Sequence, residues 1–138
     1  MAVVQSKRKQ GEMIVFTKTR ELATYTITIC SNEKNFPKRY RWCITSKIVE
    51  EALSIETNAS KANSVFVHDN YDYQLRKRYQ SLAIASTHAM LSMIDIAYRV
   101  FGIDGKRVAY WTNLIKEVQI LLCNWKKSEE EKHEEQKD

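Results

Sequence analysis

The stretch VAYWTNLIKEVQILLCNW, residues 108–125, has the clearest apolar pattern in the chain. Its apolar residues recur every three or four positions, which is the spacing of one face of an α-helix. They are Val108, Trp111, Ile115, Val118, Leu122 and Trp125. Leu114 and Leu121 widen this face, so the helix needs more than one neighbour to cover it. Asp104 is a favoured N-cap residue, and the pattern predicts a helix from there to about Lys127.

Two earlier segments repeat apolar residues at the same spacing, and they predict helices over about residues 37–67 and 71–101. The apolar face of the first contains Tyr40, Ile44, Ile48, Ala52, Ile55, Ala59, Ala62 and Phe66. That of the second contains Leu75, Tyr79, Leu82, Ala89, Met90, Met93, Ala97 and Val100. Turn-prone Asp69 and Asn70 separate the two segments, and Gly102 stands where a helix commonly ends in the left-handed conformation.

Residues 24–30, TYTITIC, alternate like a β-strand and are rich in β-branched side chains. The wider window from Glu12 to Lys34 favours a helix instead, because its apolar residues form one stripe at helical spacing. The stripe contains Val15, Phe16, Leu22, Ala23, Tyr25, Ile29 and Cys30. Ile27 falls outside this stripe, where it could face a partner subunit.

Four long helices joined by short connections predict an all-α, antiparallel up-down four-helix bundle. The chain has only three glycines and one proline among 138 residues, too few for the many turns of a β-sandwich. We expect one domain, residues 12–127, between a disordered basic arm, residues 1–11, and a disordered acidic tail, residues 128–138. Apolar residues at the edges of the helical faces predict a homo-oligomer: Ile27, Leu53, Leu114 and Leu121.

The opening MAVVQSKRKQ lacks the apolar segment of a secretory signal, and no apolar run is long enough to cross a membrane. The chain has three widely spaced cysteines, an odd number that argues against a disulfide framework. We therefore expect a cytoplasmic protein without a membrane partner, in which Cys30, Cys43 and Cys123 are buried and reduced.

The sequence contains no glycine-rich phosphate loop, nucleophile elbow or zinc-protease motif. Its one Glu-x-x-His spacing, Glu130 to His133, lies in the acidic tail, whereas a di-iron bundle needs two such pairs facing the core. His88 is expected to be a hydrogen-bonded structural residue, and Asp95 is expected to pair with Arg99 one turn later. We therefore predict no enzymatic activity, no metal site and no cofactor.

Charge is distributed unevenly along the chain. The sequence has 22 Lys and Arg against 17 Asp and Glu, a net charge of +5. The tail SEEEKHEEQKD, residues 128–138, has six acidic and two basic residues, so it carries −4 and leaves +9 on residues 1–127. A basic body with an acidic tail suggests a polyanionic partner, with the tail either solvating the protein or competing for the basic surface.

Basic residues gather where three of the predicted helices begin. They are Lys38, Arg39 and Arg41 in NFPKRYRW (residues 35–42), then Arg76, Lys77 and Arg78, and finally Lys106 and Arg107. Cations are unfavourable at this end of a helix by about 0.3–1 kcal/mol each. In an up-down bundle the second and fourth helices start at one end and the third at the other. The clusters either bind phosphates or are solvated side chains that extend over apolar surface.

From NFPKRYRW onward the sequence resembles a family of four-helix bundle proteins. This family includes the ribosomal-RNA intervening-sequence proteins and the accessory variability determinants of bacterial diversity-generating retroelements. The resemblance covers roughly residues 12–127 and consists of apolar and basic positions without a catalytic signature. It is carried by FPK (36–38), RYRWCITSKIVEEALSIETNASKANS (39–64), YQSLAIASTHAMLSMIDIAYRVFGID (79–104) and VAYWTNLIKEVQILLCNWKK (108–127). The last two segments are closest to the accessory variability determinants.

For these proteins the resemblance implies a homopentameric barrel of four-helix protomers with a positively charged surface. It implies an Avd-like, non-catalytic subunit that binds the element's reverse transcriptase and its template RNA, or DNA, and supports mutagenic cDNA synthesis. The matching basic positions are Lys38, Arg39, Arg41, Arg76, Lys77, Arg78 and Arg99, with Lys106 and Arg107 matching less closely. Trp42 could stack on an unpaired base or pack in a subunit interface. The alternative function is a protein-binding helical scaffold with an acidic partner and only incidental nucleic-acid contact.

Overall fold

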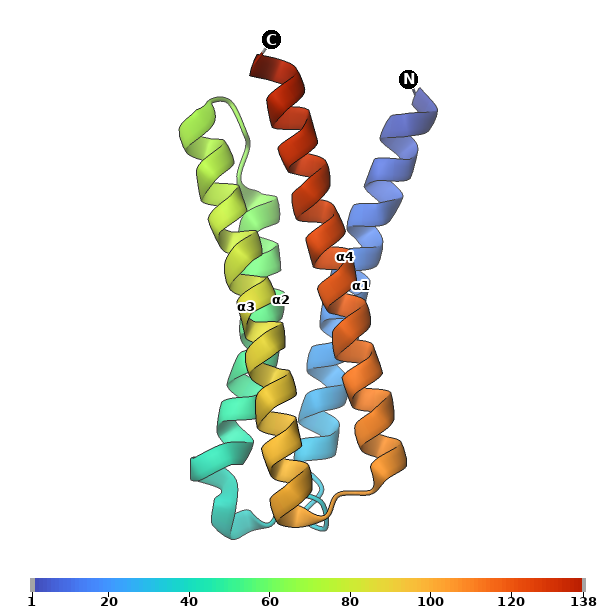
Figure 1. Cartoon of the computed structure of the whole chain (residues 1–138), viewed down its shortest axis with the longest axis vertical. Coiled ribbons are helices and arrows are strands. Elements are labelled where there is room, and N and C mark those ends of the chain that lie inside the picture. The colour runs from blue at the N-terminus through green and yellow to red at the C-terminus, as the bar shows by residue number, and fades with distance from the viewer. Residues whose placement is uncertain (1, 138) are drawn as a thin grey trace.

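The computed structural model describes the backbone of residues 2–137 and the side chains of residues 14–136. It contains four long helices: α1 (Ala2–Cys30), α2 (Ser46–Ser64), α3 (Asn70–Phe101) and α4 (Gly105–Lys137). Each helix runs antiparallel to the one before it (Figure 1). The predicted all-α up-down bundle is confirmed, and the described residues contain no β-strand.

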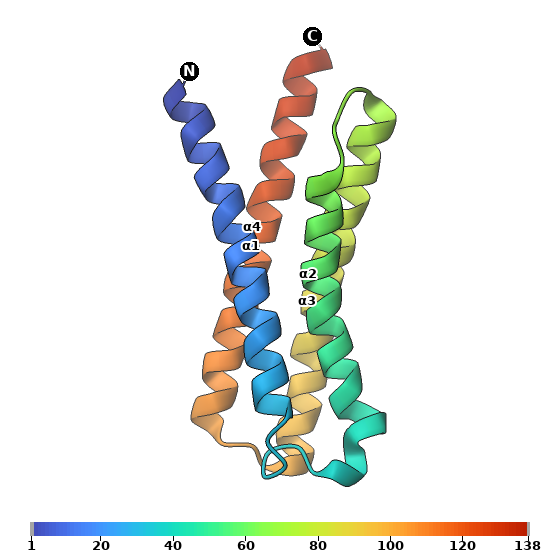
Figure 2. The ribbon, with the colours of Figure 1, turned by 180° about the vertical axis from the view of Figure 1, so that it is seen from behind.

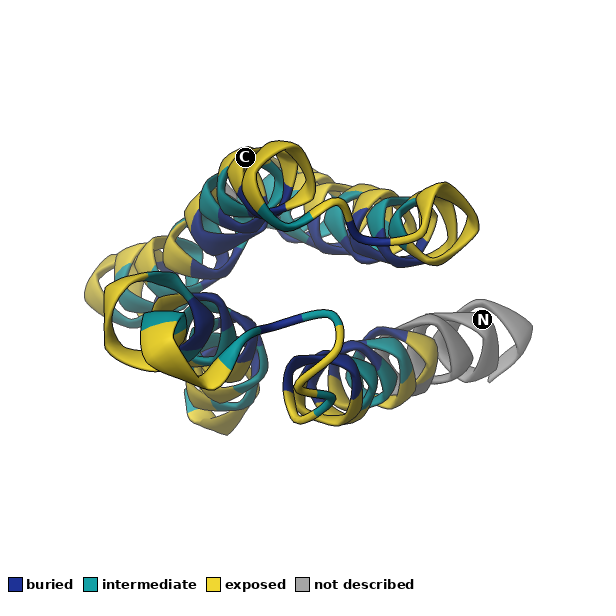
Figure 3. Cartoon of the chain, turned by 90° about the horizontal axis from the view of Figure 1, so that it is seen from below, coloured by how far each residue is buried: buried dark blue, intermediate teal, exposed yellow. Residues whose placement is uncertain are grey.

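The helices pack in chain order around the bundle. α1 contacts α2, α2 contacts α3, α3 contacts α4, and α4 returns to α1. The α1–α2 and α3–α4 connections lie at one end, and the α2–α3 connection lies at the other end with both termini (Figure 2). Viewed along the bundle, the buried residues face its centre (Figure 3). None of the described helices combines the length and apolar character that a membrane span requires.

The core draws large apolar side chains from every helix. The face predicted for residues 108–125 is confirmed from Trp111 onward, because Trp111, Ile115, Val118, Leu122 and Trp125 are buried, whereas Val108 and Leu121 are half-buried. Leu114 is also buried, although its place in the pattern predicts an edge position. Burial of each large side chain stabilises the fold by roughly 1.5–3 kcal/mol. The fully buried apolar side chains include Leu22, Ile48, Ile55, Met90, Ile94, Trp111, Ile115 and Leu122.

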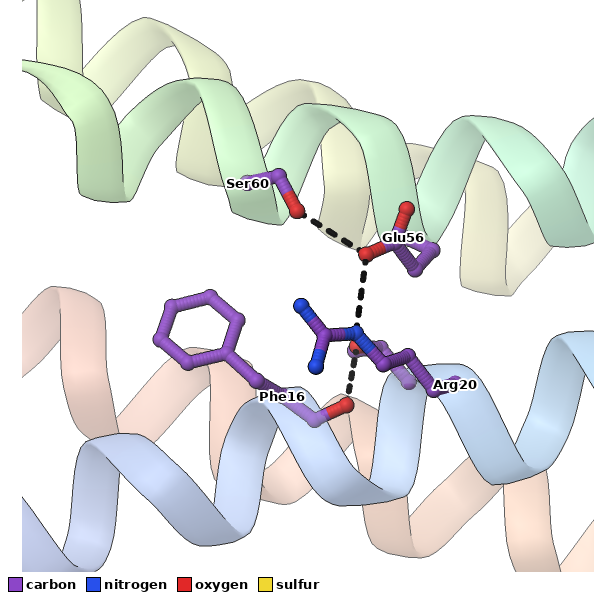
Figure 4. A network of polar contacts seen from close by, with 5 residues as sticks. Phe16, Arg20, Glu56 and Ser60 are labelled. Carbon is purple, nitrogen blue, oxygen red and sulfur yellow. Dashed lines mark hydrogen bonds and ion pairs between the residues drawn. The ribbon is translucent and has the colours of Figure 1, made fainter.

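Each seam between neighbouring helices carries a polar contact. Between α1 and α2, Arg20 Nε lies 3.5 Å from Glu56 Oε1, which also accepts a 2.9 Å hydrogen bond from Ser60 Oγ (Figure 4). The other seams hold Ser86 with Ser54 (3.1 Å), Gln119 with Thr87 (2.9 Å) and Trp111 with Thr26 (3.0 Å). Because each of these contacts joins two neighbouring helices, together they restrict sliding of one helix along the next.

The TYTITIC segment is helical, and two of its three threonines form side-chain hydrogen bonds within the bundle. Thr26 is fully buried and accepts the hydrogen bond from the indole of Trp111. Thr28 Oγ1 donates to the carbonyl of Thr24, 2.9 Å away and one helical turn earlier. Ile27 is 43% exposed, as its position outside the stripe predicts. Tertiary packing therefore overrides the β-propensity of these residues.

The predicted apolar face of α3 is only partly correct. Met90 and Ala97 are buried, but Leu82 is 44% exposed and Val100 is 62% exposed. The buried face contains smaller and more polar residues: Tyr73, Gln80, Ala83, Ser86, Thr87, Met90, Ile94 and Ala97. α3 thus has two apolar faces about 100° apart at the angular spacing of an α-helix. We call the second one the outer face of α3; it comprises Leu75, Leu82, Ala89, Met93, Ile96 and Val100.

The second predicted helix is shorter than its apolar pattern. Its first residues form a 3₁₀ turn (Lys38–Tyr40) and a π turn (Arg41–Thr45), and α2 itself begins at Ser46 and ends at Ser64. Phe66 therefore lies in the connection to α3 and is 81% exposed rather than buried. At the end of α3, Gly102 adopts the predicted left-handed conformation, with φ 64° and ψ 38°.

The thiols also differ from prediction. All three cysteines are free, but only Cys30 is buried, whereas Cys43 and Cys123 are exposed. Burial raises the pKa of the Cys30 thiol to about 12, which suppresses its thiolate at neutral pH.

The acidic tail is helical instead of disordered, because α4 extends ten residues beyond the predicted end at Lys127. Its acids find basic partners on α3, which the sequence pattern alone does not reveal. Glu129 is 9% exposed and pairs with Arg76, and Glu130 pairs with Lys77. The basic arm, residues 1–11, was also predicted to be disordered, but α1 begins at Ala2; the side chains of the arm lie outside those described.

Candidate nucleic-acid interface

NFPKRYRW leads into α2 through two irregular turns. Pro37 is extended, with φ −55° and ψ 136°, and a 3₁₀ turn follows at Lys38–Tyr40. A π-helical turn, Arg41–Thr45, then joins the start of α2. Neither turn has a side-chain N-cap. π turns are rare and often mark functional positions in helices.

Aromatic rings hold this segment against the bundle. Phe36 is buried and packs edge-on against Phe101 at 5.7 Å and against Trp111 at 6.0 Å between ring centroids. The Tyr40 ring lies 5.3 Å from Phe101. The α1–α2 connection is therefore fixed to the end of α3 and the start of α4, which brings their basic residues to the same end of the molecule.

We call this end the basic end; it carries Lys38, Arg39, Arg41, Arg99, Lys106 and Arg107. All six side chains are exposed. Arg99 pairs with Asp95 at 3.1 Å, as predicted. Among the described residues the other five form no ion pair, and Arg39 instead lies 5.9 Å from the centre of the Tyr40 ring. Exposed cations without internal carboxylate partners remain available to an external anion.

The remaining predicted basic residues lie at the opposite end of α3, and most of them have internal partners. Arg76 donates from Nε to the carbonyl of Ala62 at 3.1 Å and from Nη2 to the carbonyl of Val65, at the end of α2. Its Nη1 lies 3.1 Å from Glu129 Oε1. Lys77 pairs with Glu130 at 3.4 Å. Arg76 and Lys77 are thus structural contacts of the fold, and only Arg78 of this cluster is exposed.

A groove of about 510 Å³ opens at the basic end between the end of α1 and the turns before α2. Ile27 and Val49 contribute apolar surface, and Lys38, Arg41 and Trp42 also line it. Trp42 is 80% exposed, whereas the other two tryptophans are buried. An apolar concavity beside cations and a free aromatic face suits a ligand with a flat ring and a negative charge.

One lining residue was missed by sequence reasoning. Thr45 closes the π turn and is 8% exposed, yet its Oγ1 has no hydrogen-bond partner in the described part of the chain. A buried hydroxyl without a partner is unfavourable by roughly 1–3 kcal/mol. No pattern at the sequence level distinguishes this threonine from the hydroxyls that bond to their own helix.

The described residues contain no group of three or more His, Cys, Asp or Glu side chains that could hold a metal ion. His88 is exposed, and its Nε2 lies 3.3 Å from Gln119 Nε2. The polar groups that line the groove at the basic end are cations, hydroxyls and carboxylates.

Comparison with known proteins adds no relative. No family model matches the chain, and neither the curated proteins nor the solved structures include a significant match. The assignment of function therefore depends on the residues of the basic end and on the sequence resemblance described above.

Proposed function

We propose that the protein is a non-catalytic accessory subunit that binds RNA through its basic end. The observation that carries this proposal is the gathering of exposed cations without internal ion pairs around Lys38, Arg39 and Arg41. The resemblance to accessory variability determinants supplies the context, in which the RNA is the template of a diversity-generating retroelement and the partner is its reverse transcriptase. Phosphate contacts from such cations give affinity with little dependence on sequence.

The local electrostatics support this use of the basic end. Cations at the start of a helix are disfavoured, and neither turn before α2 has a compensating side-chain cap. A bound phosphate backbone would neutralise these cations and could accept hydrogen bonds from the uncapped backbone N–H groups. At the other end of α3, by contrast, Arg76 and Lys77 are neutralised by Glu129 and Glu130.

The direct test replaces Lys38, Arg39 and Arg41 together with Gln. Binding of a single-stranded RNA is measured across a range of salt concentrations, with circular dichroism to confirm the fold. The slope of log affinity against log salt should become shallower by about 0.7 for each phosphate that the variant no longer neutralises. A matched variant replaces three exposed lysines away from the basic end, Lys61, Lys116 and Lys127, and should retain the slope. Equal slopes in both variants would remove the basic end from RNA binding.

A second candidate is a scaffold in which the same cations bind an acidic protein. The large uncharged surface of α3 favours a protein interface of some kind, because residues 79–94 contain no Asp, Glu, Lys or Arg. In that case the triple Gln variant would lose affinity for the protein partner while its weak RNA binding kept the same salt slope. Co-purification with a retroelement reverse transcriptase would test the partner that the resemblance implies.

We further propose that the protein assembles into a homo-oligomer, a pentamer by resemblance. The outer face of α3 supports this, since Leu82, Ile96 and Val100 are 44%, 49% and 62% exposed on one helix face. Introducing a charge there, as in Leu82→Glu, should yield a monomer by light scattering at micromolar concentration. Ile120→Glu is the matched control, because Ile120 is 59% exposed and belongs to another helix, α4. A monomeric unsubstituted protein would contradict the proposal.

A further inference from the structure

The groove at the basic end combines features that phosphate binding does not need. A phosphate requires cations and hydrogen-bond donors, whereas this groove also has apolar walls from Ile27 and Val49. Two carboxylates, Glu33 and Glu50, line it as well, and they would repel a phosphate placed inside. The groove is therefore suited to an uncharged group attached to an anion that lies on the surrounding cations.

Trp42 supplies the surface on which such a group could stack. Its indole is 80% exposed at the groove, although burial of so large a side chain would otherwise be favourable. It follows Arg41 in the π turn and lies on the same groove as Lys38. An aromatic face next to cations is the arrangement by which proteins hold single-stranded nucleic acids, with bases stacked and phosphates paired.

Thr45 points independently to a ligand. Its side chain is more than nine-tenths buried and lines the groove, and its hydroxyl lacks a partner among the described residues. Its Oγ1 has almost no exposed surface, so the edge of a nucleobase, which carries donors and acceptors, would reach it once the Thr45 side chain turns toward the groove. Glu33 and Glu50 can accept hydrogen bonds from an exocyclic amino group, as carboxylates do from cytosine N4.

We infer that the groove is a subsite for one unstacked base of a single-stranded nucleic acid. The base stacks on Trp42, its edge reaches Thr45, and the flanking phosphates pair with Lys38 and Arg41. This inference rests on the proposed RNA-binding function and specifies the form of its ligand. It also predicts a preference for cytosine over uracil, because uracil presents a carbonyl where cytosine presents an amino group to the carboxylates.

The three tryptophans make the test direct, since Trp111 and Trp125 are buried and collisional quenching by acrylamide reports mainly on Trp42. The probes are oligocytidylate and oligouridylate RNA of about 12 nucleotides, within the usual range of site sizes, and a duplex RNA of equal length. Oligocytidylate should quench the emission and protect Trp42 from acrylamide. Duplex RNA should bind without protecting it.

Substitutions separate this subsite from general phosphate binding. Trp42→Ala should weaken oligocytidylate binding about five- to hundred-fold with an unchanged salt slope, because it removes base stacking and leaves the phosphate-binding cations in place. Thr45→Val should weaken it several-fold, and Glu33→Gln with Glu50→Gln should reduce the preference over oligouridylate. Phe66→Ala is the matched control, since Phe66 is equally exposed, at 81%, on the opposite end.

The two proposals can fail separately. The triple Gln variant could show the expected decrease of salt slope while Trp42→Ala retains full affinity for RNA. That result would contradict the base subsite and support RNA binding by the basic end. If no RNA binds to the unsubstituted protein, both are wrong. Protection of Trp42 by a co-purifying protein in the absence of RNA would assign the groove to a protein ligand and overturn the inference.

Discussion

Two clusters of three basic residues, Lys38, Arg39 and Arg41 at the basic end and Arg76, Lys77 and Arg78 at the other, use their charges in different ways. At the end where α3 starts, Arg76 and Lys77 bind carboxylates of α4, and Arg76 also binds the last carbonyls of α2. At the basic end, Lys38, Arg39 and Arg41 form no ion pair within the described chain. Sequence clusters of equal charge can therefore be structural in one place and available for binding in another.

The largest expected effect tests the structural role of Arg76. Its side chain is 18% exposed, and Arg76→Ala would leave Glu129, whose side chain is 11% exposed, without its partner. Removing one member of such a pair, together with the hydrogen bonds to the α2 carbonyls, should lower the free energy of unfolding by about 2–3 kcal/mol. Urea denaturation measures this. The exposed neighbour Arg78 provides the control, and Arg78→Ala should change stability by less than about 0.5 kcal/mol.

A smaller effect is expected when residues 128–138 are deleted. The deletion removes Glu129 and the His133 ring, which stacks on Tyr73 at 3.8 Å, but Arg76 can then be hydrated. We expect the free energy of unfolding to fall by about 1–2 kcal/mol, as measured by thermal or urea unfolding. Glu131→Gln with Glu135→Gln removes charge from the same segment at exposed positions and should have little effect.

Deletion of residues 128–138 also tests whether the acidic segment at one end of the bundle affects RNA binding at the other. The 32 residues of α3 span about 48 Å at 1.5 Å per residue, several times the Debye length of about 8 Å at physiological salt. RNA affinity at the basic end should therefore be unchanged by the deletion. Tighter binding would mean that the acidic segment covers a second RNA site at Arg76 and Lys77, and the distinction between the ends would fail.

Thr45→Val should act on stability and binding in opposite directions. Replacing a buried hydroxyl that has no partner with a methyl group should raise the free energy of unfolding of the free protein, by up to about 1 kcal/mol. The same change should weaken RNA binding. A protein that becomes both less stable and weaker in binding would indicate that Thr45 has a structural role only. Thr57→Val is a suitable control, because Thr57 is exposed and bonds to the carbonyl of Ser54.

The smallest change is expected from the triple Gln variant at the basic end. Removing Lys38, Arg39 and Arg41 should leave the free energy of unfolding unchanged or raise it by a few tenths of a kcal/mol per charge, since cations are disfavoured at helix starts. Arg76→Ala in the same assay provides the contrast. A destabilisation of more than about 1 kcal/mol would show that these cations, too, are structural.

Periodicity was sufficient to predict four helices and the buried face of α4, because a single apolar stripe there has only one way to be covered. Periodicity did not identify the buried face of α3. That helix has two apolar faces, and the one that packs in the core contains Gln80, Ser86 and Thr87. Composition likewise failed for the C-terminal segment. It suggested a solvated tail, but Glu129 has a specific partner 53 residues earlier in the chain.

The candidate site was predicted in part. The excess of cations over local acids in NFPKRYRW violates helix electrostatics and can be recognised from the sequence. Three other features depend on tertiary packing and have no signal in the sequence. They are the distance of these cations from Arg76 and Lys77, the groove beside Ile27, and the buried Thr45 hydroxyl. The pattern of charges could not indicate which cations have internal partners.

The π turn at Arg41–Thr45 links the aromatic contacts of Phe36 and Tyr40 to the apolar stripe of α2. Such a turn accommodates one residue more than an α-helical turn, and each residue advances a helix by about 100°. The angular position of Trp42 and Arg41 is thus set by the turn rather than by the apolar stripe of α2. Deleting one residue within it would turn Arg41 and Trp42 relative to the Phe36 and Tyr40 rings, which pack against Phe101. The extra residue of the π turn therefore lets the apolar stripe of α2 and the anchored Phe36 and Tyr40 rings both stay in place.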